Sequence, residues 1–140
     1  MTTKTQPAAQ YRFVPRRVEK PWGHELIWAL TDSYCGKLLF VEAGHALSLQ
    51  LHERKDETIH LQSGSVELEV GESRDELALE LVEEGASFRL RPGTVHRLRA
   101  LTDAVVLEVS TPHLDDVVRL EDVYGRTEPT DISAGDLFEK

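Results

Sequence analysis

Short runs of alternating hydrophobic and polar residues make up most of this chain. In residues 47–52 the leucines fall on one side of an extended backbone, and the polar residues, among them Gln50 and His52, fall on the other, which is the period of a β-strand. A second strand is expected to run from Glu57 to a turn at Gly64. Similar runs predict further strands, which cover residues 24–28, 37–42, 65–70, 77–82, 88–91, 96–100 and 105–110.

The connections between these runs are short, as in the polar segment 71–75. Many short strands with short connections are typical of an all-β sandwich or small barrel. Only residues 114–124 differ, because Val117, Leu120 and Tyr124 have the i, i+3, i+7 spacing of a short helix. At 140 residues the chain fits one domain. We divide it into an N-terminal tail, a folded domain and a C-terminal tail, which cover residues 1–12, 13–126 and 127–140.

Composition excludes several classes of protein. A hydrophobic content of 40% and a charged content of 29% are typical of a soluble globular protein. The net charge of −9 argues against a nucleic-acid partner but allows one phosphorylated metabolite in a locally basic pocket. Cys35 is the only cysteine, so the sequence predicts neither a disulfide framework nor a thiolate zinc site. No signal peptide or run of roughly 18 apolar residues is found, and we expect a cytoplasmic protein without a membrane partner.

Residues with metal-binding side chains gather at two places. Gln50, His52 and Glu57 lie on two consecutive predicted strands that flank one short loop, so they can converge. Glu57 shares a face with apolar residues, where a carboxylate is costly unless it is paired or bound to a metal. His96 follows the turn at 92–93 and is expected to supply a fourth ligand. Imidazole, carboxylate and amide groups together suit a divalent metal.

The spacing of these residues resembles the paired motifs of the cupin superfamily. In the first motif, five residues separate Gly44 from Gln50, one separates Gln50 from His52, four separate His52 from Glu57, and six separate Glu57 from Gly64. In the second, seven residues separate Gly85 from Gly93 and two separate Gly93 from His96. Three positions depart from the superfamily pattern, where Gln50 replaces a common His, Arg91 a common Pro and Ala100 a common Asn.

A narrower resemblance is to the mannose-6-phosphate isomerase cupins, which occur alone or as the C-terminal part of longer enzymes. It rests on the stretches 20–23 (Lys-Pro-Trp-Gly), 47–52, 92–97 and 116–126, and covers residues 18–126. The resemblance implies a double-stranded β-helix, or jelly-roll barrel, and a metal site formed by Gln50, His52, Glu57 and His96. It also favours a homodimer.

An isomerase of this kind would interconvert mannose 6-phosphate and fructose 6-phosphate. One divalent ion would hold the two sugar oxygens at C1 and C2, and the ligand set leaves zinc, manganese, iron, nickel and cobalt all open. Lys55 and Glu57 are the nearest candidates for the proton-transferring groups. Lys20 and Arg126 match the isomerase-like pattern and are candidate substrate contacts. Arg97 could also hold a phosphate, although strand alternation puts it opposite His96.

Two departures near the site keep other functions open. Lys55 stands where the isomerase cupins commonly carry Arg, and Glu53 and Arg54 stand where they commonly carry a His-rich loop. A lysine keeps the charge of an arginine but lacks its planar pair of donors. The alternatives are therefore a sugar- or metabolite-binding cupin without turnover, and a metal-dependent cupin dioxygenase.

Overall fold

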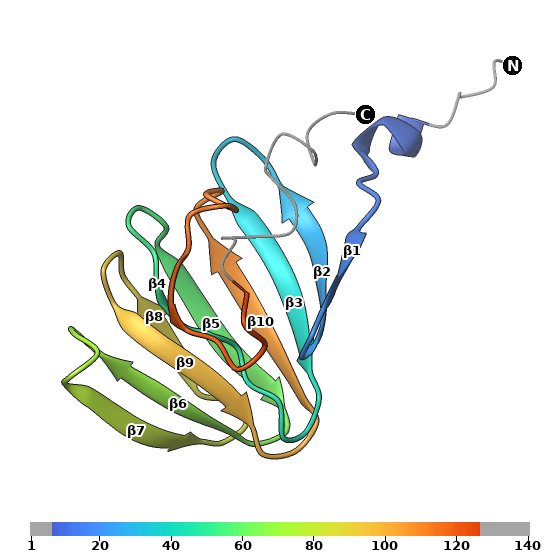
Figure 1. The fold of residues 1–140 in the computed structure, drawn as a ribbon. Helices are drawn as coiled ribbons and strands as arrows, with labels where there is room; N and C mark the ends of the chain where they lie inside the picture. Colours follow the sequence, from blue (N-terminus) through green and yellow to red (C-terminus); the bar gives the residue numbers. More distant parts are fainter. Residues whose placement is uncertain (1–6, 127–140) are drawn as a thin grey trace, which may run out of the picture.

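The structure is a computed structural model that describes residues 7–126 (Figure 1). One 3-10 turn, η1 (Pro7–Tyr11), precedes eleven strands. The strands are β1 (Arg16–Lys20), β2 (Gly23–Leu30), β3 (Cys35–Val41), β4 (Leu49–Leu51), β5 (Glu57–Ser63), β6 (Val66–Gly71), β7 (Leu77–Val82), β8 (Ser87–Leu90), β9 (Val95–Ala100), β10 (Ala104–Ser110) and β11 (Val118–Glu121). Among the described residues, no helix is long and apolar enough to cross a membrane.

The strands form two antiparallel sheets. The six-stranded sheet has the order β1-β2-β3-β10-β5-β8, and the five-stranded sheet has the order β11-β4-β9-β6-β7. The chain repeatedly passes from one sheet to the other, so that β10 lies between β3 and β5 (Figure 1). The predicted all-β, single-domain barrel is therefore confirmed.

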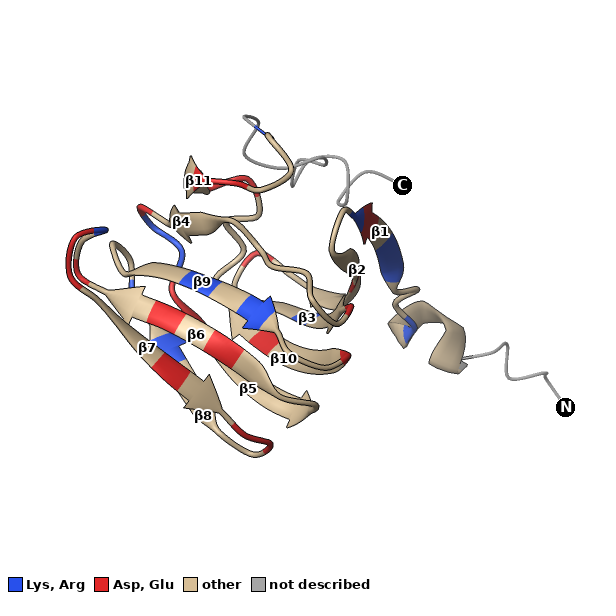
Figure 2. Cartoon of the chain, turned by 60° about the horizontal axis from the view of Figure 1, so that its bottom comes forward, with Lys and Arg blue, Asp and Glu red and all other residues tan. Residues whose placement is uncertain are grey.

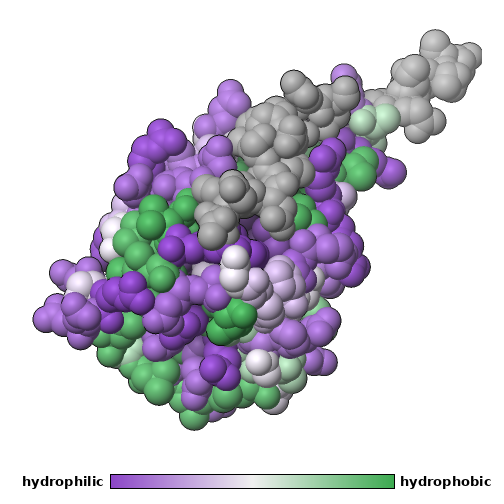
Figure 3. Space-filling model, in the orientation of Figure 1, coloured by the Kyte–Doolittle hydropathy of each residue, from purple (hydrophilic) through white to green (hydrophobic). Residues whose placement is uncertain are grey.

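The core lies between the two sheets, as strand alternation requires. Its largest side chain is Trp22, which is 2% exposed, and Leu68 of β6 and Val106 of β10 belong to the same buried cluster, one from each sheet. Burying a leucine or valine side chain contributes about 1.5–3 kcal/mol to the stability of the fold. On the outer face, the acidic bands of β6 lie beside the basic bands of β9 (Figure 2). The surface seen in Figure 3 is mostly hydrophilic, with apolar residues in separate small groups.

Gly64 joins β5 to β6 in a conformation that excludes a side chain. Its φ is +93°, and a Cβ there would lie 2.3 Å from the carbonyl oxygen of Asp103. Since L-residues rarely adopt this φ and cannot accommodate that contact, only glycine fits. This explains physically why a glycine ends the first motif.

Two local expectations were wrong. Residues 114–124 do not form a helix. Instead β11 pairs with β4, with Val118 opposite Leu51, and the hydrogen bonds of this pairing satisfy the backbone N–H and C=O groups that a helix would otherwise satisfy. Leu47 does not share a face with Leu49, because the alternation is broken before β4 begins. Its N–H donates to the carbonyl of Leu98, and its side chain lines the interior cavity. Leu49 is covered within the single chain, where it is 3% exposed.

Candidate metal centre

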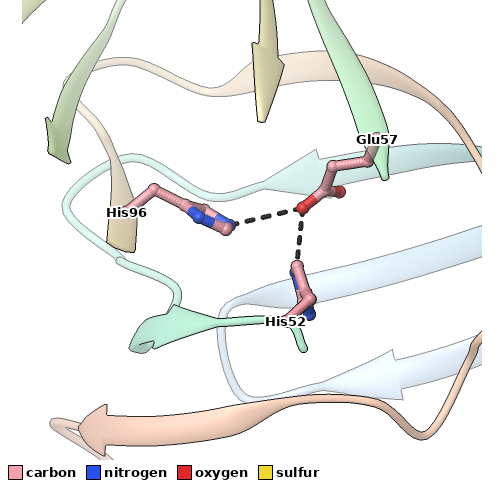
Figure 4. A group of neighbouring side chains, drawn as sticks. All are labelled: His52, Glu57 and His96. Atoms are coloured by element: carbon pink, nitrogen blue, oxygen red, sulfur yellow. Dashed lines mark ion pairs between the residues drawn. The ribbon is translucent and has the colours of Figure 1, made fainter. Parts of the chain in front are cut away.

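His52, Glu57 and His96 converge inside the barrel (Figure 4). His52 directly follows β4, Glu57 begins β5 and His96 lies on β9. The Nε2 atoms of His52 and His96 lie 2.9 Å and 3.3 Å from the same carboxylate oxygen, Oε2 of Glu57. All three residues are buried, with 4–6% of their surface exposed. The structure therefore brings together three of the four residues that the sequence predicts as ligands.

Both imidazoles are oriented by backbone carbonyl groups. Nδ1 of His52 lies 2.6 Å from the carbonyl oxygen of Asp116, and Nδ1 of His96 lies 3.0 Å from that of Thr94. A carbonyl oxygen only accepts hydrogen bonds, so each Nδ1 carries the hydrogen. In the neutral imidazole, the other nitrogen, Nε2, then has a lone pair.

The two Nε2 lone pairs are therefore directed at an anionic oxygen of Glu57. Within residues 7–126, no well-directed hydrogen bond reaches Nε2 of His52, although Glu57 is close. Lone pairs and a carboxylate repel one another unless a cation or an added proton lies between them. Backbone-anchored imidazoles are also the usual arrangement of metal-binding histidines. The donor set fits a divalent ion held by His52, His96 and Glu57.

Gln50 lies beside this group, opposite His96 in the β4–β9 pairing. Its Nε2 is 3.5 Å from Nε2 of His96, and its Oε1 accepts a hydrogen bond from the hydroxyl of Ser48 at 2.8 Å. Turning the amide by half a rotation would direct the oxygen toward the histidines and let the nitrogen donate to Ser48. The ligand role of Gln50 stays a prediction.

Lys55 links Glu57 to a second buried carboxylate. Its Nζ lies 2.8 Å from Oε2 of Glu108 and 3.6 Å from Oε1 of Glu57. Burial opposes the charge on Lys55, but the two carboxylates outweigh burial and raise its pKa above the usual value. Burial likewise opposes ionisation of Glu57, yet the positive charge of Lys55 holds its pKa well below the usual value. Since an ammonium has no lone pair, Lys55 in this state can donate a proton or fix Glu57, but it cannot accept a proton.

A second buried ion pair was not predicted. Together with Lys55 and Glu108 it forms a group of buried charges that we call the charged wall. Nζ of Lys37 on β3 lies 3.2 Å from Oε1 of Glu25 on β2, and both side chains are largely buried. The sequence held a usable signal, because Lys37 shares the apolar face of its strand with Leu39 and Val41. Glu108 stands in the same way between buried residues of β10. Strand alternation, which indicates that Glu57 is buried, therefore predicts burial of Lys37 and Glu108 as well.

The charged wall and the three candidate metal ligands line one cavity that opens to solvent. Lys20 and Arg126, two of the predicted substrate contacts, line it as well. Arg97 does not, because it points to the outer face of β9, where its Nε lies 2.7 Å from Glu69. The reason is strand alternation, since its neighbour His96 points inward. The structure therefore does not bring Arg97 to the site.

A two-sheet antiparallel barrel with two histidines and a glutamate converging in its interior is a cupin. Solved structures agree with this class. An RmlC-like cupin from Shewanella frigidimarina matches with a TM-score of 0.62 and 13% identity, over 70% of this chain and 84% of that one. A Bacillus subtilis oxalate decarboxylase with Mn(II) centres matches with a TM-score of 0.60 and 16% identity, over 70% of this chain and 27% of that one.

The sequence assigns the family within this class. Residues 8–122 match the family described as "Mannose-6-phosphate isomerase C-terminal". The xanthan biosynthesis protein XanB of Xanthomonas campestris pv. campestris is 32% identical over 117 residues, which cover 80% of this chain and 24% of XanB. The chain thus belongs to the mannose-6-phosphate isomerase C-terminal family, as the sequence resemblance indicated. It spans about a quarter of the length of the curated relatives it matches.

Proposed function

We propose that this protein is a metal-dependent sugar-phosphate isomerase that interconverts mannose 6-phosphate and fructose 6-phosphate. The observation that carries the proposal is the pair of imidazoles whose lone pairs meet at one buried carboxylate, in a chain of this family. A divalent ion bound there would supply Lewis acidity toward the neighbouring carbonyl and hydroxyl oxygens of a sugar. Zinc, manganese, iron, nickel and cobalt are all compatible with the donor set.

The charge of the cavity suits an anionic substrate. Five lysines and arginines line it, against three carboxylates, although the whole chain carries a net charge of −9. Lys20 and Arg126 are the proposed contacts of the phosphate, because both line the cavity. A local excess of positive charge in a partly enclosed site concentrates anions and orients them.

The isomerisation also needs groups that move a proton between C1 and C2. Glu57, as a ligand of the ion, would be a weak proton acceptor, and protonated Lys55 would act as a donor or a charge partner. Glu25 and Glu108 are further candidates for the acceptor, since both carboxylates line the same cavity. Burial opposes ionisation of Glu25, but Lys37 and other nearby cations outweigh burial and lower its pKa, so that Glu25 is ionised.

The direct test is turnover of mannose 6-phosphate by protein that has been stripped of metal and reloaded with each candidate ion. We expect fructose 6-phosphate to form with at least one ion, and formation to stop when a chelator is added. Proton NMR of the sugar measures the product without coupling enzymes. A loaded protein that converts neither sugar phosphate in either direction would contradict the proposal.

A second candidate function is binding of a sugar phosphate without turnover. It is favoured by the changed loop, where Lys55 is engaged by two carboxylates and the N–H groups of Glu53 and Arg54 are engaged by Asp116. Calorimetric binding of mannose 6-phosphate to loaded protein that shows no turnover would support this candidate. Oxygen consumption by the iron-loaded protein would instead indicate a cupin dioxygenase.

We further propose that the protein is a homodimer. The segment before β1 lies away from the barrel (Figure 1) and exposes Tyr11 and Val14, whose exposed fractions are 81% and 75%. β1 is also an edge strand of its sheet, so one side of its backbone can pair with another chain. Light scattering after size exclusion is expected to give twice the mass of one chain. A Tyr11→Ser, Val14→Ser variant should shift toward the monomer, and a monomeric wild type would contradict the proposal.

A further inference from the structure

We propose that Asp116 is a positioning residue of the metal centre, which fixes His52 through its backbone carbonyl and the loop between His52 and Glu57 through its carboxylate. This inference rests on the metal centre proposed above. Asp116 belongs to the segment 111–126, which we call the strap and which includes β11. The strap supplies Leu114, Val117 and Arg119 to the lining of the cavity.

The first contact is with the imidazole itself. Nδ1 of His52 donates to the carbonyl oxygen of Asp116 across 2.6 Å, between residues 64 positions apart in the chain. This hydrogen bond decides which nitrogen keeps the hydrogen and which presents a lone pair to the site. His96 needs no such partner from elsewhere, because its Nδ1 is held by Thr94, two residues away. The orientation of His52 therefore depends on the strap, whereas that of His96 is local.

The second contact is with the loop that joins two of the metal-binding residues. The carboxylate of Asp116 accepts hydrogen bonds from three successive backbone N–H groups, at 3.0 Å from Glu53, 2.7 Å from Arg54 and 2.8 Å from Lys55. Residues 53–56 are the entire connection between His52 and Glu57. Hydrogen bonds between backbone N–H groups and a carboxylate are stronger than those between neutral groups. One residue thus fixes a histidine and the path of the chain to the glutamate.

The loop also has an anchor that does not involve Asp116. The N–H of Asp56 donates to the hydroxyl of Thr111 at 3.1 Å, and the N–H of Thr111 donates to the carbonyl of Asp56 at 3.0 Å. Removing the carboxylate of Asp116 should therefore loosen residues 53–55 without detaching the loop. We expect the fold to survive this change, whereas the position of His52 relative to Glu57 should become less well defined.

The test compares Asp116→Ala and Asp116→Asn with the wild type and with Asp115→Asn, a control at the neighbouring exposed acidic residue. The dissociation constant for Mn²⁺ or Zn²⁺ is measured by calorimetry or by competition with a chelator. Asp116→Ala keeps the carbonyl that holds His52 but removes the three hydrogen bonds to the loop, so we expect binding to weaken by about 10-fold, the lower end of the range for lost outer partners of metal ligands. The metal affinity of Asp116→Asn should lie between those of the wild type and Asp116→Ala, since an amide keeps one acceptor oxygen. Asp115→Asn should bind the metal as tightly as the wild type.

A readout independent of metal follows the imidazole directly. Nitrogen NMR of metal-free protein should show His52 with its hydrogen on Nδ1 in the wild type. Alanine keeps the backbone carbonyl of residue 116, so we expect a mixture of both tautomers in Asp116→Ala because the loosened loop lets His52 move away from that carbonyl. If Asp116→Ala does not fold, Asp116→Asn decides the question by the same two measurements. Wild-type metal affinity together with an unchanged tautomer in a folded Asp116 variant would overturn the inference. A wild type that binds no metal would overturn the centre itself, and the tautomer alone would then decide the role of Asp116.

Discussion

Replacing both His52 and His96 with alanine is expected to reduce bound metal from near-stoichiometric to background. The two imidazoles supply the neutral donors of the site, and Glu57 alone, paired with Lys55, would remain. Untagged protein is loaded with each of zinc, manganese, iron, nickel and cobalt, desalted, and measured by elemental analysis. Isomerase activity should fall to background in the same variant, because the Lewis acid is lost.

The matched control replaces two other histidines, His24 and His60. His24 stacks on Phe40, and Nδ1 of His60 lies 2.7 Å from the hydroxyl of Ser87, so neither belongs to the group of three. The control variant should bind as much metal as the wild type. Metal retained by the His52→Ala, His96→Ala protein, or lost equally from the control, would show that the ion binds elsewhere. A wild type that stays metal-free with every ion would contradict the proposed mechanism.

The geometry of these three residues follows from sequence to an unusual degree. Strand alternation placed Glu57 on the apolar face of β5, where it is indeed buried. The glycine turn indicated that His96 lies at the start of the next strand, and the structure places it on β9, directly opposite Gln50. Both inferences depend only on a period of two residues, which strand geometry enforces over short distances. The spacing within the two motifs, residues 44–64 and 85–96, supplied the remaining information, namely that the two motifs meet in space.

What the sequence did not reveal depends on contacts between distant segments. The strap pairs with β4, about 70 residues earlier in the chain, and nothing in residues 114–124 themselves records that partner. An apolar spacing of i, i+3, i+7 fits a helix, yet Leu114 and Val117 serve to line the cavity. Leu47 was misplaced for a related reason, since a period-two argument fails where the strand is interrupted. The double role of Asp116 is invisible in the same way.

Arg97 illustrates the opposite case. Its proposed phosphate role rests on its positive charge and on its nearness in sequence to Arg89, Arg91 and Arg99, and strand alternation already argued against that role. In the structure Arg97 spans Glu69 and Glu121 on the outer face, at 2.7 Å and 3.1 Å. The regular geometry of a strand was a better guide here than local charge, because Arg97 directly follows the inward-pointing His96 on one strand and must therefore face the other way.

Replacing Lys55 with methionine is expected to lower the free energy of unfolding by about 3–5 kcal/mol, the usual cost of removing one partner from a buried ion pair. Glu57 and Glu108 would both remain buried, 4% and 5% exposed, and would lose the cation that lies between them. Methionine fills a similar volume, so the loss reports the charge rather than a cavity. The measurement is urea unfolding of the metal-free protein, followed by circular dichroism at neutral pH.

Lys55→Arg is the matched variant, because it keeps the charge and introduces the residue that related isomerase cupins commonly carry at this position. We expect it to lose much less stability than Lys55→Met, since a guanidinium can contact both carboxylates at once. If the methionine variant were as stable as the wild type, the buried carboxylates would have to be neutral or solvated in solution. The pairing of Lys55 with Glu57 and Glu108 would then not be what keeps Glu57 ionised and ready to bind a cation.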